Sequence, residues 1–476
     1  MASRILSIVI SFIYFSFLAK SFAKPPVTTL PGQPTHVSFK QYSGYIVTDA
    51  AHGRALFYYL VEADSAHPLS RPLTLWLNGG PGCSSVGFGV LMEHGPFQPK
   101  DNRLLAKNKY SWNLESNMLY VDSPIGVGFS YSNTSSDYTS YNDTTTAEDN
   151  LKFLLNWLEK FPKYKNSDLY LAGESYAGHF IPQLASLLLE YNKKPNIRPI
   201  KLKGVALGNP LLDLDISIAF AENLWSHGAI SDETLMLEKT VCKISRYFKE
   251  FVHNNLSKEC SDVFDRINKE VGDELDRNDL LSLQCLPSTE AEQFRAAKAI
   301  MHSNIGAVLL RGAGDPCLPD RILAYLNKPV VQKALHAVPT NWSFCAGPLQ
   351  YQMESLATNM IPIISDLLKS DIPIMFYSGD QDTKIPLTQT RIIANNVARS
   401  LKLVPLTSYG PWYDNKQVGG WAQSFGKQRE GKNVTYLTFA TVRGGSHEVP
   451  YTSPSQTLTL FRVFLSGSLL PAPKVS

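Results

Sequence analysis

One serine in the sequence lies where a hydroxyl group could act as a nucleophile. Ser175 belongs to the segment Gly173-Glu-Ser-Tyr-Ala-Gly178, between a predicted strand and a predicted helix. We interpret this segment as a sharp turn of the GxSxG type, in which small residues let the backbone bend tightly. The N-terminus of the following helix would face negative charge that develops during a reaction. The segment therefore predicts acyl transfer through a covalent intermediate.

A serine nucleophile needs a base and an acid that orients the base, and this architecture orders them serine, acid, histidine along the chain. Asp380 and Asp382 follow a predicted strand, and sequence order does not separate them. His447 is the only one of the 10 histidines beyond them, so it is the predicted base. His179 is closer to Ser175 along the chain, but it lies on the helix after the turn and is interpreted as a packed or solvated histidine.

Acyl transfer also needs N–H donors for the oxyanion, each of which contributes about 10²–10³ in rate. The segment Leu73–Ser85 is a predicted strand that runs into a glycine-rich turn. In α/β-hydrolases the second oxyanion donor lies in such a turn. The alternative is a tight turn without a catalytic role.

The elements that must position these residues alternate between strands and helices. Runs of β-branched and aromatic residues predict strands near Tyr45–Thr48, Ala55–Glu62, Leu73–Leu77, Met118–Val121, Leu169–Ala172, Gly204–Leu207, Ile374–Tyr377 and Tyr436–Thr441. Helical periodicity is found in Thr145–Lys160, Ala177–Tyr191, Pro329–Ala337, Ser355–Lys369 and Leu387–Leu401. The order predicts an α/β fold with a mostly parallel sheet covered by helices on both faces.

The strand pattern disappears between residues 213 and 317, where the sequence is helical and charged. We interpret residues 213–317 as a helical insertion, or lid, in a core formed by residues 24–212 and 318–476. The alternative is a second, independent domain.

The first 23 residues predict a signal peptide. Arg4 precedes an apolar run of 14 residues, Ile5–Leu18, and Ser21-Phe-Ala23 supplies a cleavage pattern. A membrane-spanning helix needs ~20 residues, although an uncleaved anchor remains the alternative. No later segment is apolar and long enough to cross a bilayer, so no membrane association is expected after cleavage. The expected localisation is secreted or vacuolar, through the secretory pathway.

Cysteines and glycosylation signals agree with that compartment. The 6 cysteines include no CxxC pair, which argues against a zinc site or a thioredoxin-like redox site and favours disulfides. Six cysteines can pair in 15 ways, and the sequence alone does not choose among them. Five Asn-x-Ser/Thr acceptors predict surface loops that carry glycans: Asn133, Asn142, Asn255, Asn341 and Asn433. With 45 basic and 42 acidic residues, the composition does not indicate a nucleic-acid partner. No metal and no cofactor is expected.

The chain resembles the serine carboxypeptidases, most closely the plant serine carboxypeptidase-like proteins of the carboxypeptidase II (D) type. The resemblance covers nearly the whole mature chain. Its ordered motifs are LPGQP near Leu30, LTLWLNGGPGCSS at Leu73–Ser85, VDSPIGVGFSYS at Val121–Ser132, AGESYAGHFIPQLA at Ala172–Ala185, GNPLLD at Gly208–Asp213, YLNKPVVQKALHA at Tyr325–Ala337, YSGDQD at Tyr377–Asp382 and GGSHEVP at Gly444–Pro450.

The resemblance implies an α/β-hydrolase fold and a role for each matching residue. It implies a catalytic triad of Ser175, Asp382 and His447, and an oxyanion hole formed by the N–H groups of Gly80 and Tyr176. The residues implied to hold the substrate's terminal carboxylate are Asn78, Gly79 and Glu174, with Trp76 lining the site and Glu93 supporting Glu174. The implied disulfides are Cys83–Cys345, Cys242–Cys260 and Cys285–Cys317, and some family members are cut between the last two cysteines, here residues 286–316.

Two features concern substrate preference. The resemblance implies that Glu448 faces the residue before the scissile bond, where a carboxylate favours Lys or Arg. Ser446 and Thr383-Lys384 depart from the commoner plant pattern, which has Gly before the histidine and Gly-Arg or Ser-Arg after the acid.

The expected function is therefore a serine carboxypeptidase that acts on peptide or protein C-termini at acidic pH. One alternative is an acyltransferase of the same fold that uses glucose esters, which Asn78 and Glu448 disfavour. The other is an inactive binding protein, which the filled triad positions disfavour. The sequence leaves open whether the enzyme forms a homodimer.

Overall fold

The computed structural model describes residues 26–27, 29–101, 103–273, 275–283, 285, 314–345, 347–429 and 432–471. The predicted signal peptide, residues 1–23, lies outside the described residues, as do residues 286–313 of the predicted processed linker. Within the described ranges, no helix has the length and apolar character needed to cross a membrane.

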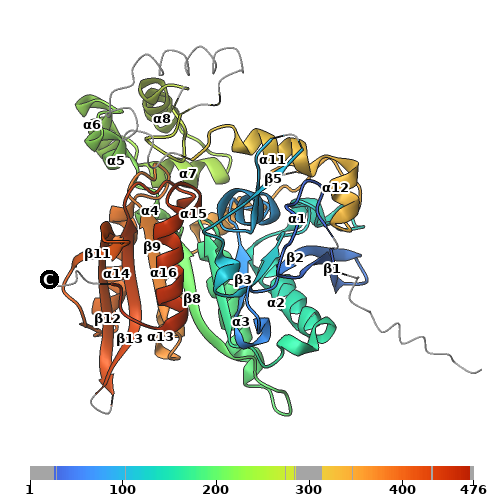
Figure 1. Cartoon of the computed structure of the whole chain (residues 1–476). Coiled ribbons are helices and arrows are strands. Elements are labelled where there is room, and N and C mark those ends of the chain that lie inside the picture. The colour runs from blue at the N-terminus through green and yellow to red at the C-terminus, as the bar shows by residue number, and fades with distance from the viewer. Residues whose placement is uncertain are drawn as a thin grey trace, which may run out of the picture.

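A mixed β-sheet forms the centre of the molecule (Figure 1). In the described part of the chain it has 11 strands in the order β1-β2-β6-β3-β7-β8-β9-β13-β12-β10, with β11 paired to β12. The strands from β6 to β13 run parallel, and both edges are antiparallel. These strands are β1 Gln41–Asp49, β2 Arg54–Val61, β3 Leu73–Leu77, β6 Asn117–Val121, β7 Leu169–Glu174, β8 Leu202–Gly208, β9 Ile374–Gly379, β10 Val404–Pro405, β11 Gly410–Asp414, β12 Gln417–Arg429 and β13 Lys432–Val442. The predicted mostly parallel sheet is confirmed.

Helices cover both faces of the sheet because side chains alternate along each central strand. On β3, for example, Leu75 and Leu77 belong to one apolar cluster and Trp76 to the other. The first cluster contains residues of α2 Asp143–Lys160, α3 Ala177–Asn192, α13 Ile361–Lys369 and α14 Leu387–Ser400. The second contains residues of α11 Leu318–Leu326, α12 Pro329–Ala334, α15 Val449–Thr452, α16 Pro454–Ser466 and the π-helix η2 Val86–Glu93.

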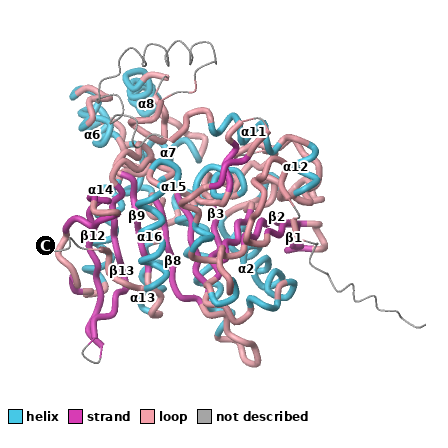
Figure 2. Tube along the Cα trace, viewed as in Figure 1, coloured by secondary structure: helices cyan, strands magenta, loops and turns pink. Residues whose placement is uncertain are grey.

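The shorter elements connect this frame. A two-stranded ribbon pairs β4 Phe97–Pro99 with β5 Leu105–Lys107, and α1 spans Asp137–Ser140. Single helical turns are η1 Pro68–Ser70, η3 Trp112–Leu114, η4 Pro162–Tyr164 and η5 Met353–Ala357. Figure 2 shows how these turns and loops surround the strands.

A group of helices between β8 and β9 lies over one end of the sheet, at the top of Figure 1. They are α4 Leu214–Ser217, α5 Ala221–Ser226, α6 Asp232–Thr240, α7 Ile244–Val252 and α8 Lys258–Val271. They have an apolar cluster of their own, which includes Leu224, Ile244 and Val263 and the disulfide Cys242–Cys260. These helices lie within residues 213–317, and we use the name insertion for that whole segment.

Two further disulfides, Cys83–Cys345 and Cys285–Cys317, complete the pairing that the family resemblance implies. Among the described residues no cysteine is free. Cys83–Cys345 joins the turn after β3 to a segment 262 residues later in the sequence.

Candidate active site

Ser175 occupies a strained turn at the carboxyl end of β7. Its φ is +59°, in the left-handed region, and its N–H donates to the carbonyl of Gly208 at 2.9 Å. A Cβ on Gly173 would lie 2.6 Å from the carbonyl oxygen of Leu77, and one on Gly178 would lie 2.4 Å from that of Leu211. Only glycine therefore fits at both positions.

The turn differs in one detail from the GxSxG pattern. The residue two places after Ser175 is Ala177, which begins α3, and the second required glycine is Gly178. Both small residues let α3 pack closely, since Ala177 and Gly178 are buried. The result is an elbow of the predicted kind with the glycine displaced by one residue.

His447 and Asp382 form the second part of the site. The Nδ1 atom of His447 lies 2.8 Å from Oδ2 of Asp382, and both side chains are buried. Burial lowers the pKa of His447, but the negative charge and hydrogen bond of Asp382 outweigh it, so the pKa of His447 is raised. The carboxylate therefore holds the imidazole in one orientation and stabilises its protonated form.

The two acids that sequence order left unresolved have different partners. Asp380 accepts from the N–H of Gly444 at 2.7 Å and from the side chain of Gln381 at 3.1 Å. It therefore braces the loop after β13, whereas Asp382 contacts the imidazole of His447. The backbone N–H groups of Lys384 and Ile385 donate to the other oxygen of Asp382, at 2.7 and 3.1 Å.

Asn209 is part of this arrangement although the sequence reasoning gave it no role. Its amide nitrogen donates to Oδ2 of Asp382, and its Oδ1 accepts from the N–H of Gly379 at 3.2 Å. It follows β8 directly, in the segment Gly208-Asn209-Pro210. A polar residue immediately after a buried central strand is the signal that could have identified it.

These contacts bring the ends of four neighbouring parallel strands together. Ser175 follows β7, Asn209 follows β8, Asp382 lies beyond β9 and His447 lies beyond β13. The carboxyl ends of parallel strands are where α/β folds place ligands.

His179 is a buried histidine with its own acid. Its Nδ1 lies 2.8 Å from Oδ2 of Asp143, and its ring stacks on Tyr176 with 4.6 Å between centroids. Tyr176 also donates its hydroxyl to Asp143, at 3.0 Å. These contacts agree with the interpretation of His179 as a packed residue that supports α3.

The glycine-rich turn after β3 touches the elbow. A Cβ on Gly79 would lie 2.4 Å from the backbone nitrogen of Tyr176. Gly80, Ser175 and Tyr176 line the same cavity of about 460 Å³. As the residue before α3, Tyr176 also has an N–H without an intrahelical acceptor. The N–H groups expected to form the oxyanion hole therefore come from two segments in contact beside Ser175.

Next to the elbow, an amide holds two buried carboxyl groups. Nδ2 of Asn78 donates to Oε1 of Glu93 and to Oε1 of Glu174, each at 2.9 Å. The exposed fractions are 2% for Asn78, 1% for Glu93 and 3% for Glu174. Nε1 of Trp76 donates to Oδ1 of Asn78 at 2.6 Å, which fixes the amide with its nitrogen toward the acids. Trp76, Asn78, Glu93 and Glu174 are therefore joined by hydrogen bonds, and these are residues that the resemblance assigns to the site for the substrate's terminal carboxylate.

Two such acids cannot both ionise without a large cost. Burial is the main cause that raises the pKa of Glu93, to about 8. Burial and the nearby charge of Glu93 raise the pKa of Glu174 well above its usual range. Because the pKa values of both acids are raised, the protonated forms are favoured at neutral pH.

Glu448, which the resemblance places against the residue before the scissile bond, is buried beside a second cavity. It lines this cavity of about 530 Å³, together with Phe88 and Met92 of η2, the helix that carries Glu93. The residues around the Ser175 cavity do not include Glu448. Burial raises the pKa of Glu448 to about 7, and its charge in turn raises the pKa of Glu93 and Glu174. Glu448 is therefore close enough to influence the titration of the carboxyl pair and of His447, and it does not line the Ser175 cavity.

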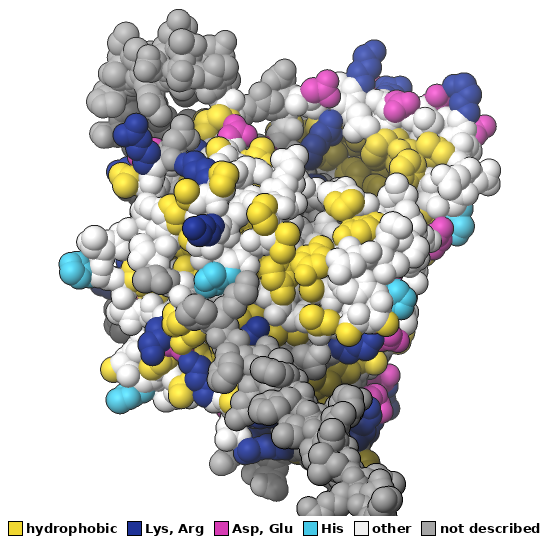
Figure 3. Space-filling view, turned by 90° about the vertical axis from the view of Figure 1, so that its right-hand side faces the viewer, with side chains coloured by type: hydrophobic (Ala, Val, Ile, Leu, Met, Phe, Trp, Pro, Cys, Tyr) yellow, Lys and Arg dark blue, Asp and Glu magenta, His cyan; other side chains and the backbone are white. Residues whose placement is uncertain are grey.

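The surface agrees with the nearly balanced composition. On the face shown in Figure 3, basic and acidic side chains are interspersed among apolar ones.

Of the five glycosylation acceptors, Asn133, Asn255 and Asn341 are exposed. Asn142 is half-buried, and its side-chain oxygen caps α2 by accepting from the N–H of Thr145 at 3.0 Å. The side chain of Asn433 lies outside the described residues.

The parallel strand order, the helices on both faces and the serine elbow after a central strand define an α/β-hydrolase. A family model described as serine carboxypeptidase matches residues 31–467. The chain therefore belongs to the serine carboxypeptidase family.

Named relatives agree along almost the whole chain. Serine carboxypeptidase-like 45 of Arabidopsis thaliana is 45% identical over 449 residues, which cover 94% of this chain and 93% of the relative. Serine carboxypeptidase-like 44 of the same plant is 46% identical over 452 residues, covering 94% and 90%. These matches confirm the resemblance and the expected enzyme class, a serine-type carboxypeptidase.

One solved structure supports the fold. Kex1(Δ)p, a prohormone-processing carboxypeptidase from Saccharomyces cerevisiae, superposes with a TM-score of 0.72. The match covers 94% of this chain and 96% of that one, at 20% identity. It therefore confirms the α/β-hydrolase fold.

Proposed function

We propose that this enzyme removes single residues from the C-termini of peptides through an acyl-enzyme formed on Ser175. The observation that carries the proposal is the buried pair of Glu93 and Glu174, held by Asn78 beside the elbow, where burial raises the pKa of both acids and favours their protonated forms. A protonated carboxyl group and an amide N–H can both donate to a carboxylate. A site of this kind favours a substrate that ends in a free carboxylate close to the bond that is cut.

The reaction follows from the positions of the polar groups. His447 takes the proton of the Ser175 hydroxyl as the oxygen attacks the scissile carbonyl carbon. The N–H groups of Gly80 and Tyr176 donate to the oxyanion. His447 then gives the proton to the departing amino group, and water hydrolyses the ester on Ser175 by the same route. Asp382 orients and stabilises the imidazolium throughout.

A comparison of substrates tests this function. The purified protein is incubated with N-blocked dipeptides that have a free C-terminal carboxylate, and separately with a glucose ester plus an alcohol acceptor. Release of the C-terminal amino acid is the expected result. Ester formation without amino acid release would instead support the acyltransferase, and neither product would support an inactive binding protein.

We further propose that Glu448 selects a basic C-terminal residue. If the terminal carboxylate lies at Glu174, the side chain of that residue extends into the cavity with Phe88, Met92 and Glu448. This revises the sequence-based expectation, which placed Glu448 against the residue before the scissile bond. A carboxylate in a partly desolvated cavity attracts a Lys or Arg side chain.

Replacement of Glu448 by Gln should lower the preference for a C-terminal Arg over Leu by roughly tenfold. The two measurements are kcat/KM for a pair of dipeptides that differ only in the last residue, above pH 7 where Glu448 is ionised. A pair that differs only in the preceding residue is the control. If Glu448→Gln changes the control ratio instead, the sequence-based placement is the better one.

We also propose a secreted or vacuolar enzyme that carries glycans on its exposed acceptors. The three disulfides support an oxidising compartment. Asn133, Asn255 and Asn341 are the most accessible acceptors among those whose exposure the structure describes.

A further inference from the structure

Two neighbouring cavities lie at the candidate active site, and residues 275–278 lie between them. Leu275 lines both cavities. Of the residues that follow it, Asp276 and Asn278 line the cavity of Glu448, whereas Arg277 lines the cavity of Ser175. Neighbouring residues of opposite charge thus face opposite sides of the wall.

The charges around each cavity have a single sign. Among the described residues lining the Ser175 cavity, the charged ones are Arg277 and Lys384, and none is acidic. Among those lining the other cavity, the charged ones are Asp276 and Glu448, and none is basic. One side of the reaction centre is therefore positive and the other is acidic.

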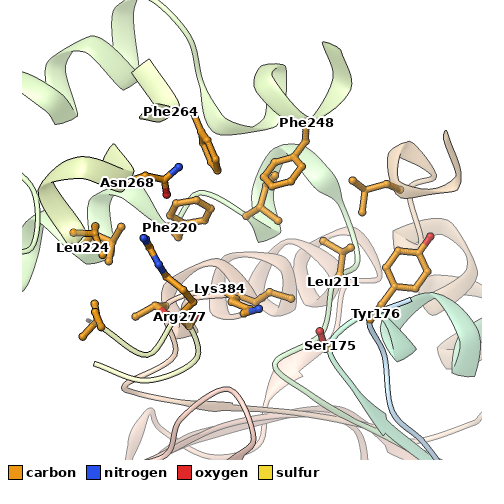
Figure 4. A pocket seen from close by; sticks show the side chains of 17 residues that line it. Ser175, Tyr176, Leu211, Phe220, Leu224, Phe248, Phe264, Asn268, Arg277 and Lys384 are labelled. Carbon is orange, nitrogen blue, oxygen red and sulfur yellow. Dashed lines mark hydrogen bonds between the residues drawn. The ribbon is translucent and has the colours of Figure 1, made fainter. Parts of the chain in front are cut away.

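Figure 4 shows how the two cations lie within the Ser175 cavity. Phe220, Phe248 and Phe264 of the insertion form one wall, opposite Ser175, and Arg277 and Lys384 lie beside them. The remaining lining is mostly apolar. Apolar walls strengthen the field of charges at their edge, because they reduce the volume of water that screens it.

Backbone contacts position the two residues that carry these charges. Lys384 lies two residues after Asp382, and its N–H donates to that carboxylate at 2.7 Å. Its charge is close enough to lower the pKa of both His447 and Glu448. Nη2 of Arg277 donates to the carbonyl of Gly272 at 3.0 Å, just after α8. The positive side is thus built partly by the core and partly by the insertion.

The position of the substrate follows from the proposed function. The terminal carboxylate at Glu174 and Glu93 directs the last side chain into the acidic cavity, because η2 supplies both Glu93 and the wall of that cavity. With the scissile carbonyl at Ser175, the preceding residue extends into the cavity of Arg277 and Lys384. This part of the argument rests on the peptidase activity proposed above.

We propose that Arg277 and Lys384 select an acidic residue before the scissile bond. Preferred substrates then end in an acidic residue followed by a basic one, matched in charge to the two cavities. Both cations are exposed to solvent, so the selection is moderate and weakens with salt. An apolar or aromatic side chain before the scissile bond also fits the apolar walls of this cavity. The effect of charge is therefore measured by comparing substrate side chains of the same shape, such as Glu and Gln.

The test uses N-blocked dipeptides that end in Arg and carry Glu, Gln or Lys before it. At pH 6 the Glu side chain of the substrate is ionised. For the unaltered enzyme we expect kcat/KM for Glu to exceed that for Gln by roughly two- to tenfold, with Lys the poorest. In the double variant Arg277→Gln, Lys384→Gln, the ratio of Glu to Gln should fall to about 1. A rise in sodium chloride to about 0.5 M should lower the ratio of the unaltered enzyme in the same direction.

Two controls separate charge from structure. The double variant Lys369→Gln, Arg399→Gln removes two cations that do not line either cavity, and its Glu to Gln ratio should stay unchanged. The variant Arg277→Lys, Lys384→Arg keeps both charges and should keep the ratio. A native ratio of 1 or less, or a ratio that survives in the double Gln variant, would overturn the inference while leaving the peptidase intact. Failure to cleave any of the dipeptides would overturn the proposed function and this inference with it.

Discussion

Replacement of Ser175 by Ala should reduce kcat roughly 10⁴-fold or more and abolish covalent labelling by an organofluorophosphate. Alanine keeps the Cβ that the turn already accommodates at φ +59°, so the elbow is not expected to change. What is lost is the hydroxyl oxygen that we propose attacks the carbonyl. Labelling and activity are measured on the same purified sample, with circular dichroism as the check on folding.

The two aspartates provide a matched pair for the same experiment. Asp382→Asn removes the charge that raises the pKa of His447, and it favours the wrong imidazole tautomer, so a loss of about 10⁴-fold in kcat is expected. Asp380→Asn should cost far less, because Asp380 contacts the N–H of Gly444 and not the imidazole. Equal losses would contradict the choice of Asp382, and labelling that persists in Ser175→Ala would place the nucleophile elsewhere.

The elements with a strong hydrophobic pattern were predictable from the sequence. The eight predicted strands correspond to β1, β2, β3, β6, β7, β8, β9 and β13. All except β1 are interior strands of the sheet, and the central ones bury both faces and leave continuous apolar runs. The edge that contains β10, β11 and β12 was missed. The strand β12, Gln417–Arg429, has three glycines and a single β-branched residue, Val418, so it lacks the run of β-branched residues that predicts a strand. One predicted helix, Ser355–Lys369, is divided into η5 and α13 because Pro362 lies in the first turn of α13.

The chemistry of the site was predictable only where residue order settles it. Ser175 and His447 follow from the elbow and from the single histidine beyond the acids. The choice between Asp380 and Asp382 and the side on which Glu448 lies depend on how loops fold after the strands end. The cations of the Ser175 cavity could not be foreseen either, because Arg277 comes from the insertion and Lys384 from the core. Residues about 100 apart in sequence meet there through tertiary packing alone.

The second large effect should be a dependence of KM on pH that comes from Glu93 and Glu174. Their proposed role is to donate hydrogen bonds to a carboxylate, which they can do only while protonated. Because burial raises the pKa of Glu93 to about 8 and that of Glu174 well above its usual range, the donors are present at acidic and neutral pH. As pH rises above about 8 they are lost, so KM for free-acid dipeptides should then rise by up to roughly tenfold per pH unit.

Neighbouring groups add little to this titration except for Glu448. Tyr120 and Tyr377 face the pair, but burial raises the pKa of both hydroxyls well above 10, so they remain neutral. Glu448 ionises near pH 7 and repels the substrate carboxylate before the pair itself ionises. The variant Glu448→Gln should therefore remove an early rise in KM and leave the later one.

His447 sets the opposite limit. It must be neutral to accept the proton of Ser175, and its raised pKa means that it is protonated over more of the acidic range than an ordinary histidine. Its protonation should lower kcat/KM as pH falls. Activity therefore lies in a window with His447 at its acidic side and the carboxyl pair at its alkaline side, and the raised pKa of His447 limits how far the expected acidic activity extends.

The double variant Glu174→Gln, Glu93→Gln tests which group causes the alkaline limit. Glutamine amides donate hydrogen bonds without titrating, so KM should become almost independent of pH above about 8, while the fall at low pH remains. Dipeptides whose terminal carboxylate is blocked as an amide should bind more weakly at pH 6 and lose less affinity on the way to pH 9, because they do not need a protonated partner. If KM in the double variant still rises as it does in the unaltered enzyme, then Glu174 and Glu93 only brace the elbow, and another group must bind the substrate carboxylate.

That outcome would also remove the reason for placing the C-terminal residue on the side of η2. The assignments of both cavities therefore depend on this one titration.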